Sequence, residues 1–431
     1  MTENSEPAET PPIIKEDPYA ALRFKEYRRF LAGSLISLLG MQMQATAVGH
    51  EIFHQTNSNF AVAVVALVQF LPVLLLSLPA GQVADTYSRK RIVQGAMSIV
   101  TCSSLGLACL SFFHGPLWGM YLCLFLNGAA RAFQQPAKSS LMPLIVPRSV
   151  FRNAVTWNSG AFQLGSIVGP AIAGLLIWTV GSYALIYLFE GLSTLTFVIL
   201  LGSISIPEPV RQAWSDPFQS FQQGWHFLFS QKVLLAAISL DLFAVLLGGA
   251  TTLLPAYEKI LHVGAWEFGL MRSAPAFGAL LMSVLIAFRP PLQRAGRTLL
   301  LCVAGFGVAT IVFGISRSFP LSLAMLILLG ALDMISVVIR HTLVQLLTPD
   351  EMRGRVQAVN GLFIGASNEL GGFESGAVAA AFDRTDDPAF GPTVSVVTGG
   401  IGTILVVAYV AKACPPLRNY DRLEDGAHSS S

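Results

Sequence analysis

The chain has 431 residues, of which 53% are hydrophobic and only 12% are charged. Soluble domains carry about 25% charged residues, so this composition excludes an ordinary soluble domain. The net charge of +2 comes from basic residues spread among many short segments, which excludes a nucleic-acid-binding surface.

Long segments without acidic or basic residues recur along the chain, for example residues 60–84 and 92–113. A helix rises about 1.5 Å per residue, so about 20 apolar residues cross a bilayer. We therefore predict an all-α membrane protein with twelve spanning helices. They are expected at residues 29–53, 60–84, 92–113, 117–141, 155–179, 183–206, 233–255, 266–288, 298–316, 320–346, 357–382 and 393–412.

The basic residues outside these spans predict the orientation. Twenty Lys and Arg residues fall on the side that holds both termini, and three fall on the other. An excess of basic residues marks the cytoplasmic side, so we expect a multi-pass protein of the inner (plasma) membrane with both termini in the cytoplasm. The expected units are an N-terminal tail (1–28), a six-helix bundle (29–206), a linker (207–232), a second six-helix bundle (233–412) and a C-terminal tail (413–431).

Polar residues interrupt the first span. Gln42 and Gln44 lie near its centre, and His50 and Glu51 lie near its outer end. We expect His50 and Glu51 to be solvated at the membrane interface, since polar ends of side chains reach water there.

The second span is followed by the segment GQVADTYSRKR. A glycine, an aspartate four residues later and a basic pair resemble the loop signature of the major facilitator superfamily, although Ser88 stands where that pattern usually has glycine. The resemblance implies a fold of two pseudo-symmetric six-helix bundles, in which this loop locks the cytoplasmic side of the outward-facing state. The alternative is a basic anchor at the cytoplasmic surface. The matching residues are Gly81, Asp85, Arg89 and Lys90.

The fifth span reads GAFQLGSIVGPAIAG and resembles the glycine–proline signature of antiporters in the same superfamily. Its glycines leave a smooth face for close helix packing, and its proline removes one backbone hydrogen bond and bends the helix. The resemblance implies export by antiport, whereas ordinary packing of small residues is the alternative. The matching residues are Gly165, Gly169, Pro170 and Gly174.

The linker contains aromatic residues at helical spacing. Phe218, Phe221, Trp225 and Phe229 predict an amphipathic helix at the cytoplasmic interface. A helix that packs on the bundle fits the same pattern, and either arrangement separates six spans from six.

The two halves of the chain are related by a constant offset of 202 residues (349 − 147). One register without gaps covers two spans and the loop between them, which predicts a parallel repeat of two six-helix halves. The matched pairs are Pro147 and Pro349, Gly128 and Gly330, Lys138 and Arg340, Asn158 and Asn360, Gly169 and Gly371, and Gly174 and Gly376.

Charges inside spans are costly and need a partner, water or protonation. The offset places Arg131 of the fourth span on Asp333 of the tenth. We predict that Arg131 and Asp333 form, or alternate in, a charge pair in the central cavity that responds to substrate or protons; a purely structural pair is the alternative. Arg340 and His341 are expected to meet headgroups or acids of the loops.

The eleventh span, IGASNELGGFESGAV, carries two carboxylates. Glu369 and Glu374 are five residues apart and so about 140° apart around a helix, which allows at most one of them to face the cavity. We favour Glu369 as the residue that carries protons. The resemblance implies that the first, fourth, seventh and tenth spans line the cavity. The predicted cavity and coupling residues are Gln42, Gln44, Arg131, Asp241, Arg272, Asp333, Asn368, Glu369 and Glu374.

Residues 20–415 as a whole resemble a branch of bacterial efflux permeases that includes exporters of the siderophore enterobactin. The resemblance implies a proton-coupled exporter of a small organic molecule, siderophore-like or an amphiphilic drug, that works by alternating access. A lipid or lysolipid flippase and a non-transporting receptor remain alternatives. No motif for nucleotide hydrolysis is present, so we predict no enzyme activity, no cofactor and no metal site, and a monomer whose partners are its substrate, protons and lipid.

Overall fold

The computed structural model describes residues 17–206, 217–288 and 294–420, and the regular elements within these ranges are helices. The predicted tails and linker fall partly outside the described residues, at 1–16, 207–216 and 421–431. In the N-terminal half, the helices that match predicted spans begin and end within a few residues of the expected positions. They are α1 (Lys25–Thr56), α2 (Asn59–Thr86), α3 (Arg89–Phe112), α4 (Leu117–Ser139), α6 (Phe151–Val180) and α7 (Tyr183–Gly202), with the short α5 (Met142–Ile145) after α4.

The C-terminal half repeats this order. Among the described residues, ten helical segments in the chain are long and apolar enough to cross a membrane; α4 and α14, which carry central charges, complete the twelve-helix fold. The elements of this half are α9 (Lys232–Leu247), α10 (Leu254–Ile260), α11 (Ala265–Ala287), α12 (Ala295–Ile315), α13 (Phe319–Leu347), α14 (Asp350–Ala381), α15 (Phe390–Ala413) and the short α16 (Pro415–Arg418).

The seventh span differs from the prediction of one helix at 233–255. It is interrupted after Leu247 at Gly248 and Gly249, passes through a 3-10 turn (η3, Ala250–Leu253) and continues as α10 to Ile260. A side chain at Gly249 would meet the carbonyl oxygen of Gly371 on α14. The glycine pair therefore lets two backbones approach each other closely at the point where the helix breaks.

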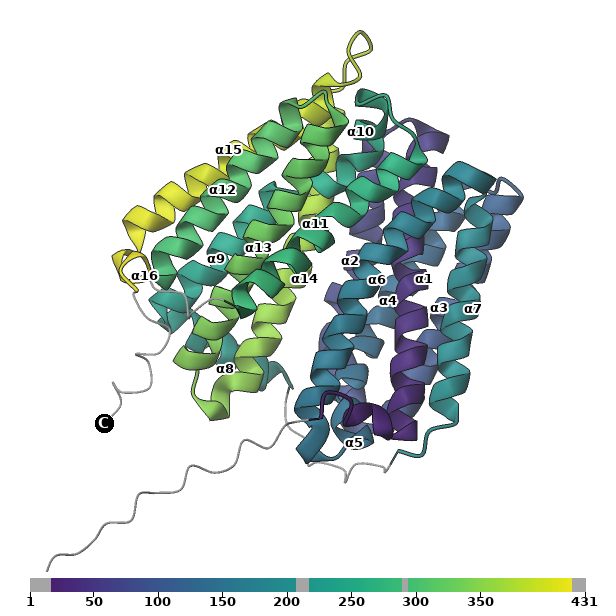
Figure 1. Cartoon of the computed structure of the whole chain (residues 1–431), viewed down its shortest axis with the longest axis vertical. Helices are drawn as coiled ribbons and strands as arrows, with labels where there is room; N and C mark the ends of the chain where they lie inside the picture. The colour runs from purple at the N-terminus through teal and green to yellow at the C-terminus, as the bar shows by residue number, and fades with distance from the viewer. Residues whose placement is uncertain (1–16, 207–216, 289–293, 421–431) are drawn as a thin grey trace, which may run out of the picture.

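The long helices form two bundles, one from each half of the chain (Figure 1). The bundles meet near α10 and diverge toward the end that holds α5 and α8, and we call these the α10 end and the tail end. At the α10 end, one buried apolar cluster includes Ala256 and Ala265 of the C-terminal half together with residues of α1, α2, α4, α6 and α7. Burial of apolar surface thus joins the halves there.

The surroundings of four glycines on one face of α14 show that the two bundles diverge toward the tail end. Gly361, Gly365, Gly372 and Gly376 share a face at helical spacing. Added methyl groups at Gly372 and Gly376 would contact α2, whereas at Gly361 and Gly365 they would meet nothing within 4 Å. The helices α2 and α14 therefore touch near the α10 end and separate toward the tail end.

The halves also repeat a close helix crossing. A methyl group at Gly128 of α4 would meet Gln69 and Pro72 of α2, and one at Gly330 of α13 would meet Pro275 of α11. Gly128 and Gly330 are partners in the 202-residue repeat. Each crossing sets a glycine against a helix that contains a proline.

We expect Gly330→Ala to lower the free energy of unfolding by about 1–3 kcal/mol, since the added methyl group would overlap the carbonyl oxygen of Pro275 in a packed interface. Thermal unfolding of the purified protein measures this. Gly361→Ala is the matched control, because its methyl group enters open space. Equal losses in the two variants would contradict the crossing as the cause.

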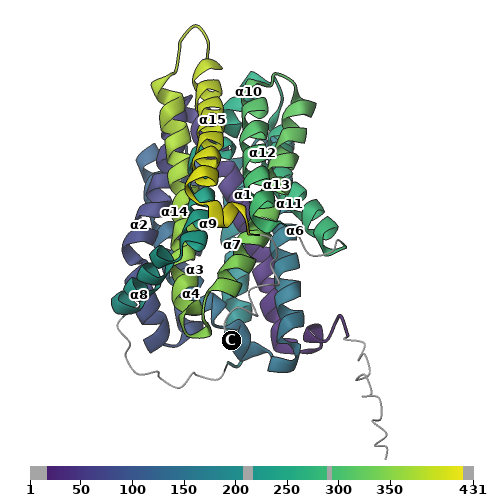
Figure 2. The same ribbon diagram turned by 90° about the vertical axis from the view of Figure 1, so that its left-hand side faces the viewer.

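The linker helix α8 (Pro217–Ser230) packs against α14 near the tail end (Figure 2). Gly224 lies against the backbone of Arg355, and Leu228 is fully buried. Trp225 stacks on Phe363 of α14 with ring centroids 5.5 Å apart, and both Trp225 and Phe229 stay partly exposed. The side chains of Phe218 and Phe221 lie outside the described part of the structure. The helix is thus attached to the C-terminal bundle along one face.

Candidate functional site

A cavity of about 430 Å³ lies between the two bundles, which is the size range of small-molecule sites. Residues of α1, α2 and α4 line it on one side, and η3, α11 and α14 line it on the other. Six of the residues predicted for the cavity line it: Gln42, Gln44, Arg131, Arg272, Asn368 and Glu369.

Arg131 and Glu369 face each other across this cavity from opposite halves. Their closest charged atoms are 3.7 Å apart, and 42% and 27% of the two side chains are exposed to the interior space. Arg131 also donates a hydrogen bond of 3.4 Å to Gln69. An ion pair of this length between partly exposed side chains contributes only about 0–1 kcal/mol to stability.

Arg272 of α11 lines the same cavity, and its charge acts on Glu369 together with that of Arg131. Its guanidinium donates a 3.1 Å hydrogen bond to the carbonyl oxygen of Thr251. Thr251 lies in η3, where the broken span leaves carbonyl groups without helical partners. The interruption therefore anchors a cavity cation.

The structure does not bring Arg131 and Asp333 together, so the predicted pair between repeat positions is wrong. Asp333 lies 3.8 Å from Arg340, and Arg340 also forms an ion pair with Asp241. Arg340 is buried, not at the headgroups as predicted. Asp241 and Asp333 thus belong to a separate cluster inside the C-terminal bundle, because all three residues lie on α9 and α13.

The remaining polar residues predicted for the cavity differ in their environment. Gln44 is buried and accepts a 2.9 Å hydrogen bond from Ser104 of α3. Asn368 donates to the carbonyl of Ile364 at 2.8 Å. Glu374 is not among the residues that line the cavity; its carboxylate lies 3.4 Å from the Ser375 hydroxyl. Glu369 is therefore the acid of α14 that faces the cavity.

Glu190 is a cavity residue that the sequence analysis did not include. Its side chain is buried on α7 and accepts hydrogen bonds of 3.1 Å from Ser193 and Thr194. Gly40 of α1 makes room for the carboxylate, since a side chain there would overlap it. The pairing of Glu190 with a glycine on another helix is not a pattern that can be recognised along one sequence.

The loop signature lies at the tail end. Arg89 donates a 3.3 Å hydrogen bond to the carbonyl of Ser140, and Lys90 donates to the carbonyls of Gly202 and Ile204 at 2.9 and 2.7 Å. These contacts stay within the N-terminal bundle. The side chain of Asp85 lies outside the described part of the structure, and a methyl group at Gly81 would meet nothing within 4 Å.

The glycine–proline motif of the predicted fifth span lies on α6 and faces two helices. Side chains at Gly165 and Gly169 would overlap Leu38 and Gln42 of α1, and one at Gly174 would overlap Ala265 and Gly269 of α11. Pro170 is buried and lies inside the helix. The motif therefore packs α6 against α1 in its own half and against α11 of the other half.

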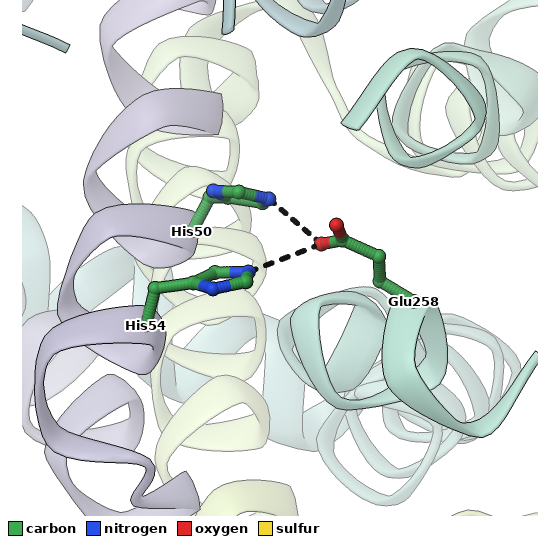
Figure 3. A group of neighbouring side chains, drawn as sticks. All are labelled: His50, His54 and Glu258. Carbon is green, nitrogen blue, oxygen red and sulfur yellow. Dashed lines mark hydrogen bonds and ion pairs between the residues drawn. The ribbon is translucent and has the colours of Figure 1, made fainter. Parts of the chain in front are cut away.

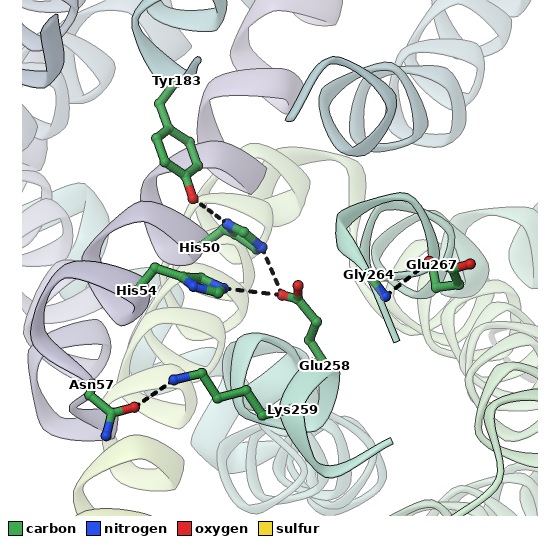
Figure 4. A network of polar contacts seen from close by, with 8 residues as sticks. All are labelled: His50, His54, Asn57, Tyr183, Glu258, Lys259, Gly264 and Glu267. Atoms are coloured by element: carbon green, nitrogen blue, oxygen red, sulfur yellow. Dashed lines mark hydrogen bonds and ion pairs between the residues drawn. The ribbon is translucent and has the colours of Figure 1, made fainter. Parts of the chain in front are cut away.

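His50 and Glu51 were predicted to be solvated, yet both are only 2% exposed. Glu51 accepts hydrogen bonds of 2.6 Å from Ser111 and Tyr187. His50 points the other way, toward Tyr183 and toward Glu258 of the C-terminal half (Figure 4). Because successive residues of a helix point in different directions, Glu51 contacts the N-terminal bundle and His50 reaches across the interface to the other half.

Comparisons with known proteins agree with this arrangement. A family described as transmembrane secretion effector matches residues 16–408. The chain is 26% identical to the enterobactin exporter EntS of Citrobacter koseri over 408 residues, which cover 93% of this chain and 95% of that protein. It is 25% identical to EntS of Shigella boydii serotype 18, over 91% of this chain and 93% of that protein.

Two solved structures share the fold. A bacterial homologue of the human lysosomal transporter Spinster, inward-facing and occupied, has a TM-score of 0.72 and 16% identity, and covers 93% of this chain and 98% of that one. A D-xylose–proton symporter has a TM-score of 0.69 and 14% identity, with coverages of 93% and 99%. At such identities the likeness concerns the fold.

Proposed function

Because the chain belongs to the transmembrane secretion effector family of the major facilitator superfamily, we propose that it exports a small organic molecule in exchange for protons. The chain is a multi-pass membrane transporter and not an enzyme. Direction, driving ion and substrate class are the parts that we propose.

One observation carries the proposal. A cavity between two pseudo-symmetric bundles is lined by Arg131 of one half and by Arg272 and Glu369 of the other. The bundles contact each other at the α10 end and diverge at the tail end. Such a site is exposed to each side in turn when the bundles rock about it.

The distribution of basic residues supports a cytoplasmic location of the tail end. With that orientation, the described structure is open toward the cytoplasm and closed toward the outside. An exporter loads its substrate in this state. The antiporter-like motif around Pro170, which packs α6 against both α1 and α11, supports the same direction.

Closure of the tail end should bring Gly81 against α14. Ala63 and Gly81 share a face of α2, and near the α10 end that face already contacts Gly376. Continuing the same antiparallel crossing along both helices places Gly81 opposite Ala358, about one helical turn from Gly361. Gly81 is therefore the position on α2 where we propose that the closed state needs a small residue.

We expect Gly81→Leu to leave thermal stability unchanged and to reduce transport at least about tenfold, equivalent to about 1.4 kcal/mol against the closed state. The leucine enters open space in the described state and blocks the approach of α14 on closure. Gly95→Leu on α3 is the matched control, since its side chain also enters open space but lies away from the interface between the halves. Normal transport by Gly81→Leu would contradict this role.

Relatives named as enterobactin exporters support a siderophore-like substrate. The cavity offers two guanidinium groups, one ammonium group, two carboxylates and several amides. Guanidinium groups bind planar oxygen-rich anions with paired hydrogen bonds. A catecholate or another oxygen-rich chelator is therefore the substrate class that we propose, with amphiphilic drugs as the second class.

The test uses purified protein in proteoliposomes with an imposed pH gradient and a panel of siderophores, amphiphilic drugs and a labelled lysolipid. We expect one oxygen-rich compound to move against its gradient while protons move in the opposite direction. Movement that is unchanged when the pH gradient is collapsed would refute proton antiport. Movement of the lysolipid alone would replace export of a soluble molecule by lipid translocation.

A further inference from the structure

Two histidines and a glutamate meet at the α10 end, outside the central cavity (Figure 3). His50 and His54 come from α1 of the N-terminal half, and Glu258 comes from α10 of the C-terminal half. The Nε2 atoms of His50 and His54 lie 2.7 and 3.4 Å from the same carboxylate oxygen of Glu258. The cluster therefore joins the two bundles at the end where they are closed.

The three donors are arranged as ligands of one ion. One nitrogen or oxygen atom of each side chain lies within 4.8 Å of those of the other two. Donor atoms on a tetrahedral Zn²⁺ with bonds of about 2.0–2.1 Å are about 3.3–3.4 Å apart. The distance of 3.4 Å from His54 to Glu258 already has this value, and the distance of 2.7 Å from His50 needs to widen by roughly 0.6–0.7 Å.

The His50 nitrogen that faces the cluster is buried. The His50 side chain is 3% exposed, and its Nε2 atom lies 2.7 Å from the Glu258 carboxylate. Its other nitrogen, Nδ1, lies 2.8 Å from the Tyr183 hydroxyl, the kind of outer contact that orients a metal-binding histidine.

We propose that His50, His54 and Glu258 bind a Zn²⁺ ion that bridges the two halves of the transporter. Two imidazoles and one carboxylate favour Zn²⁺ over the hard cations Mg²⁺ and Ca²⁺. His54 is 37% exposed, which leaves access for the ion and for water as the fourth ligand.

The neighbouring charges fit this assignment. Lys259 turns away from the cluster and donates a 2.6 Å hydrogen bond to Asn57 (Figure 4). Its ammonium group also lies over the ring of Phe53. Glu51, which follows His50, points into the N-terminal bundle toward Ser111 and Tyr187. Glu51 is therefore not placed to activate a metal-bound water, as the glutamate of a zinc peptidase does.

The segment HEIFH, residues 50–54, contained the signal for this site. Histidines four residues apart share one helix face, and H-E-x-x-H is a metal-binding spacing. The prediction of no metal site did not take this spacing into account. The third ligand, Glu258, lies 204 residues from His54 and is brought to the site only by the fold.

Binding is tested on the purified full-length protein in detergent with Zn²⁺ alone, by equilibrium dialysis. We expect one high-affinity ion per chain, and at least about tenfold weaker binding in His54→Ala and in Glu258→Gln, because loss of an outer-shell partner alone already costs tenfold or more. His114→Asn, which removes an exposed histidine at the α10 end, is the control and should bind like the wild type. Zn²⁺ affinity that is the same in all variants, or absent in the wild type, would overturn the proposal.

A bridging ion should also hold the α10 end closed, and this consequence rests on the proposed function. Zn²⁺ added to the compartment that faces the α10 end should slow transport by the wild type and not by His54→Ala. If Zn²⁺ binds but transport is not slower, the bridging role is wrong and the proposed metal site still stands. Failure to observe any transport would bear on the proposed function and not on the dialysis result.

Discussion

Replacing Arg340 with methionine is expected to lower the free energy of unfolding by about 3–5 kcal/mol, one of the two largest effects predicted for this protein. Arg340 is buried and contacts Asp241, which is buried as well, and Asp333 lies 3.8 Å away. Methionine fills much of the volume but leaves the Asp241 carboxylate without a counter-charge. Unfolding in mixed detergent micelles, followed by the helical signal, measures the loss.

A second variant separates the lost charge from lost packing. Asp241→Leu combined with Arg340→Met removes both charges and should recover most of the stability, because a buried pair replaced by apolar residues of similar size is close to neutral. Asp333→Asn should cost little, since 47% of the Asp333 side chain is exposed. If the double variant is as unstable as Arg340→Met, an uncompensated charge is not the cause.

Glu369→Gln is expected to reduce transport driven by a pH gradient at least about tenfold, an effect of more than about 1.4 kcal/mol on coupling. Glu369 is the acid of α14 that lines the cavity, and it faces Arg131 of the other half and Arg272 of its own. Glutamine keeps the shape but cannot exchange a proton or pair with a guanidinium in one state and release it in the other. The measurement is accumulation in proteoliposomes with an imposed gradient.

Glu374→Gln is the matched control, because Glu374 lies on the same helix but outside the cavity, and it should keep driven transport. An exchanged pair, Arg131→Glu with Glu369→Arg, tests the alternative that the contact is only structural. It should preserve folding and expression. If it also transports at the wild-type rate with the same pH dependence, the proton-coupling role of Glu369 is wrong.

Much of the fold followed from the sequence because membrane helices are set by apolar length. Leu117 and Tyr183 begin α4 and α7 at the predicted residues. The break in the seventh span was missed, although Gly248 and Gly249 are visible in the sequence. A glycine pair inside an apolar run is also common in continuous membrane helices, so the neighbour that requires the break, Gly371 of α14, had to be known first.

Part of the candidate site was predicted from the sequence, and the wrong prediction concerns which charged residues pair. Helix rotation predicts that at most one of Glu369 and Glu374 faces the cavity, and Glu369 is favoured because it lies nearer the span centre and beside Asn368; the structure places Glu369 in the cavity. The pairing of Arg131 with Asp333 rested on the repeat, but equivalent positions in two related bundles need not be in contact. Arg131 pairs instead with Glu369, and Asp333 lies near Arg340.

The interruption of the seventh span has a mechanical consequence. It divides one stretch of chain into two helices, α9 and α10, which are separated by Gly248, Gly249 and η3. Asp241 of α9 forms an ion pair within the C-terminal bundle, and Glu258 of α10 forms an ion pair with the opposite bundle. Tyr257 of α10 is fully buried and donates a 2.9 Å hydrogen bond to the carbonyl of Gly314, so α10 is also held in the C-terminal bundle. A movement of α1 at the α10 end is therefore transmitted through Glu258 to the C-terminal bundle.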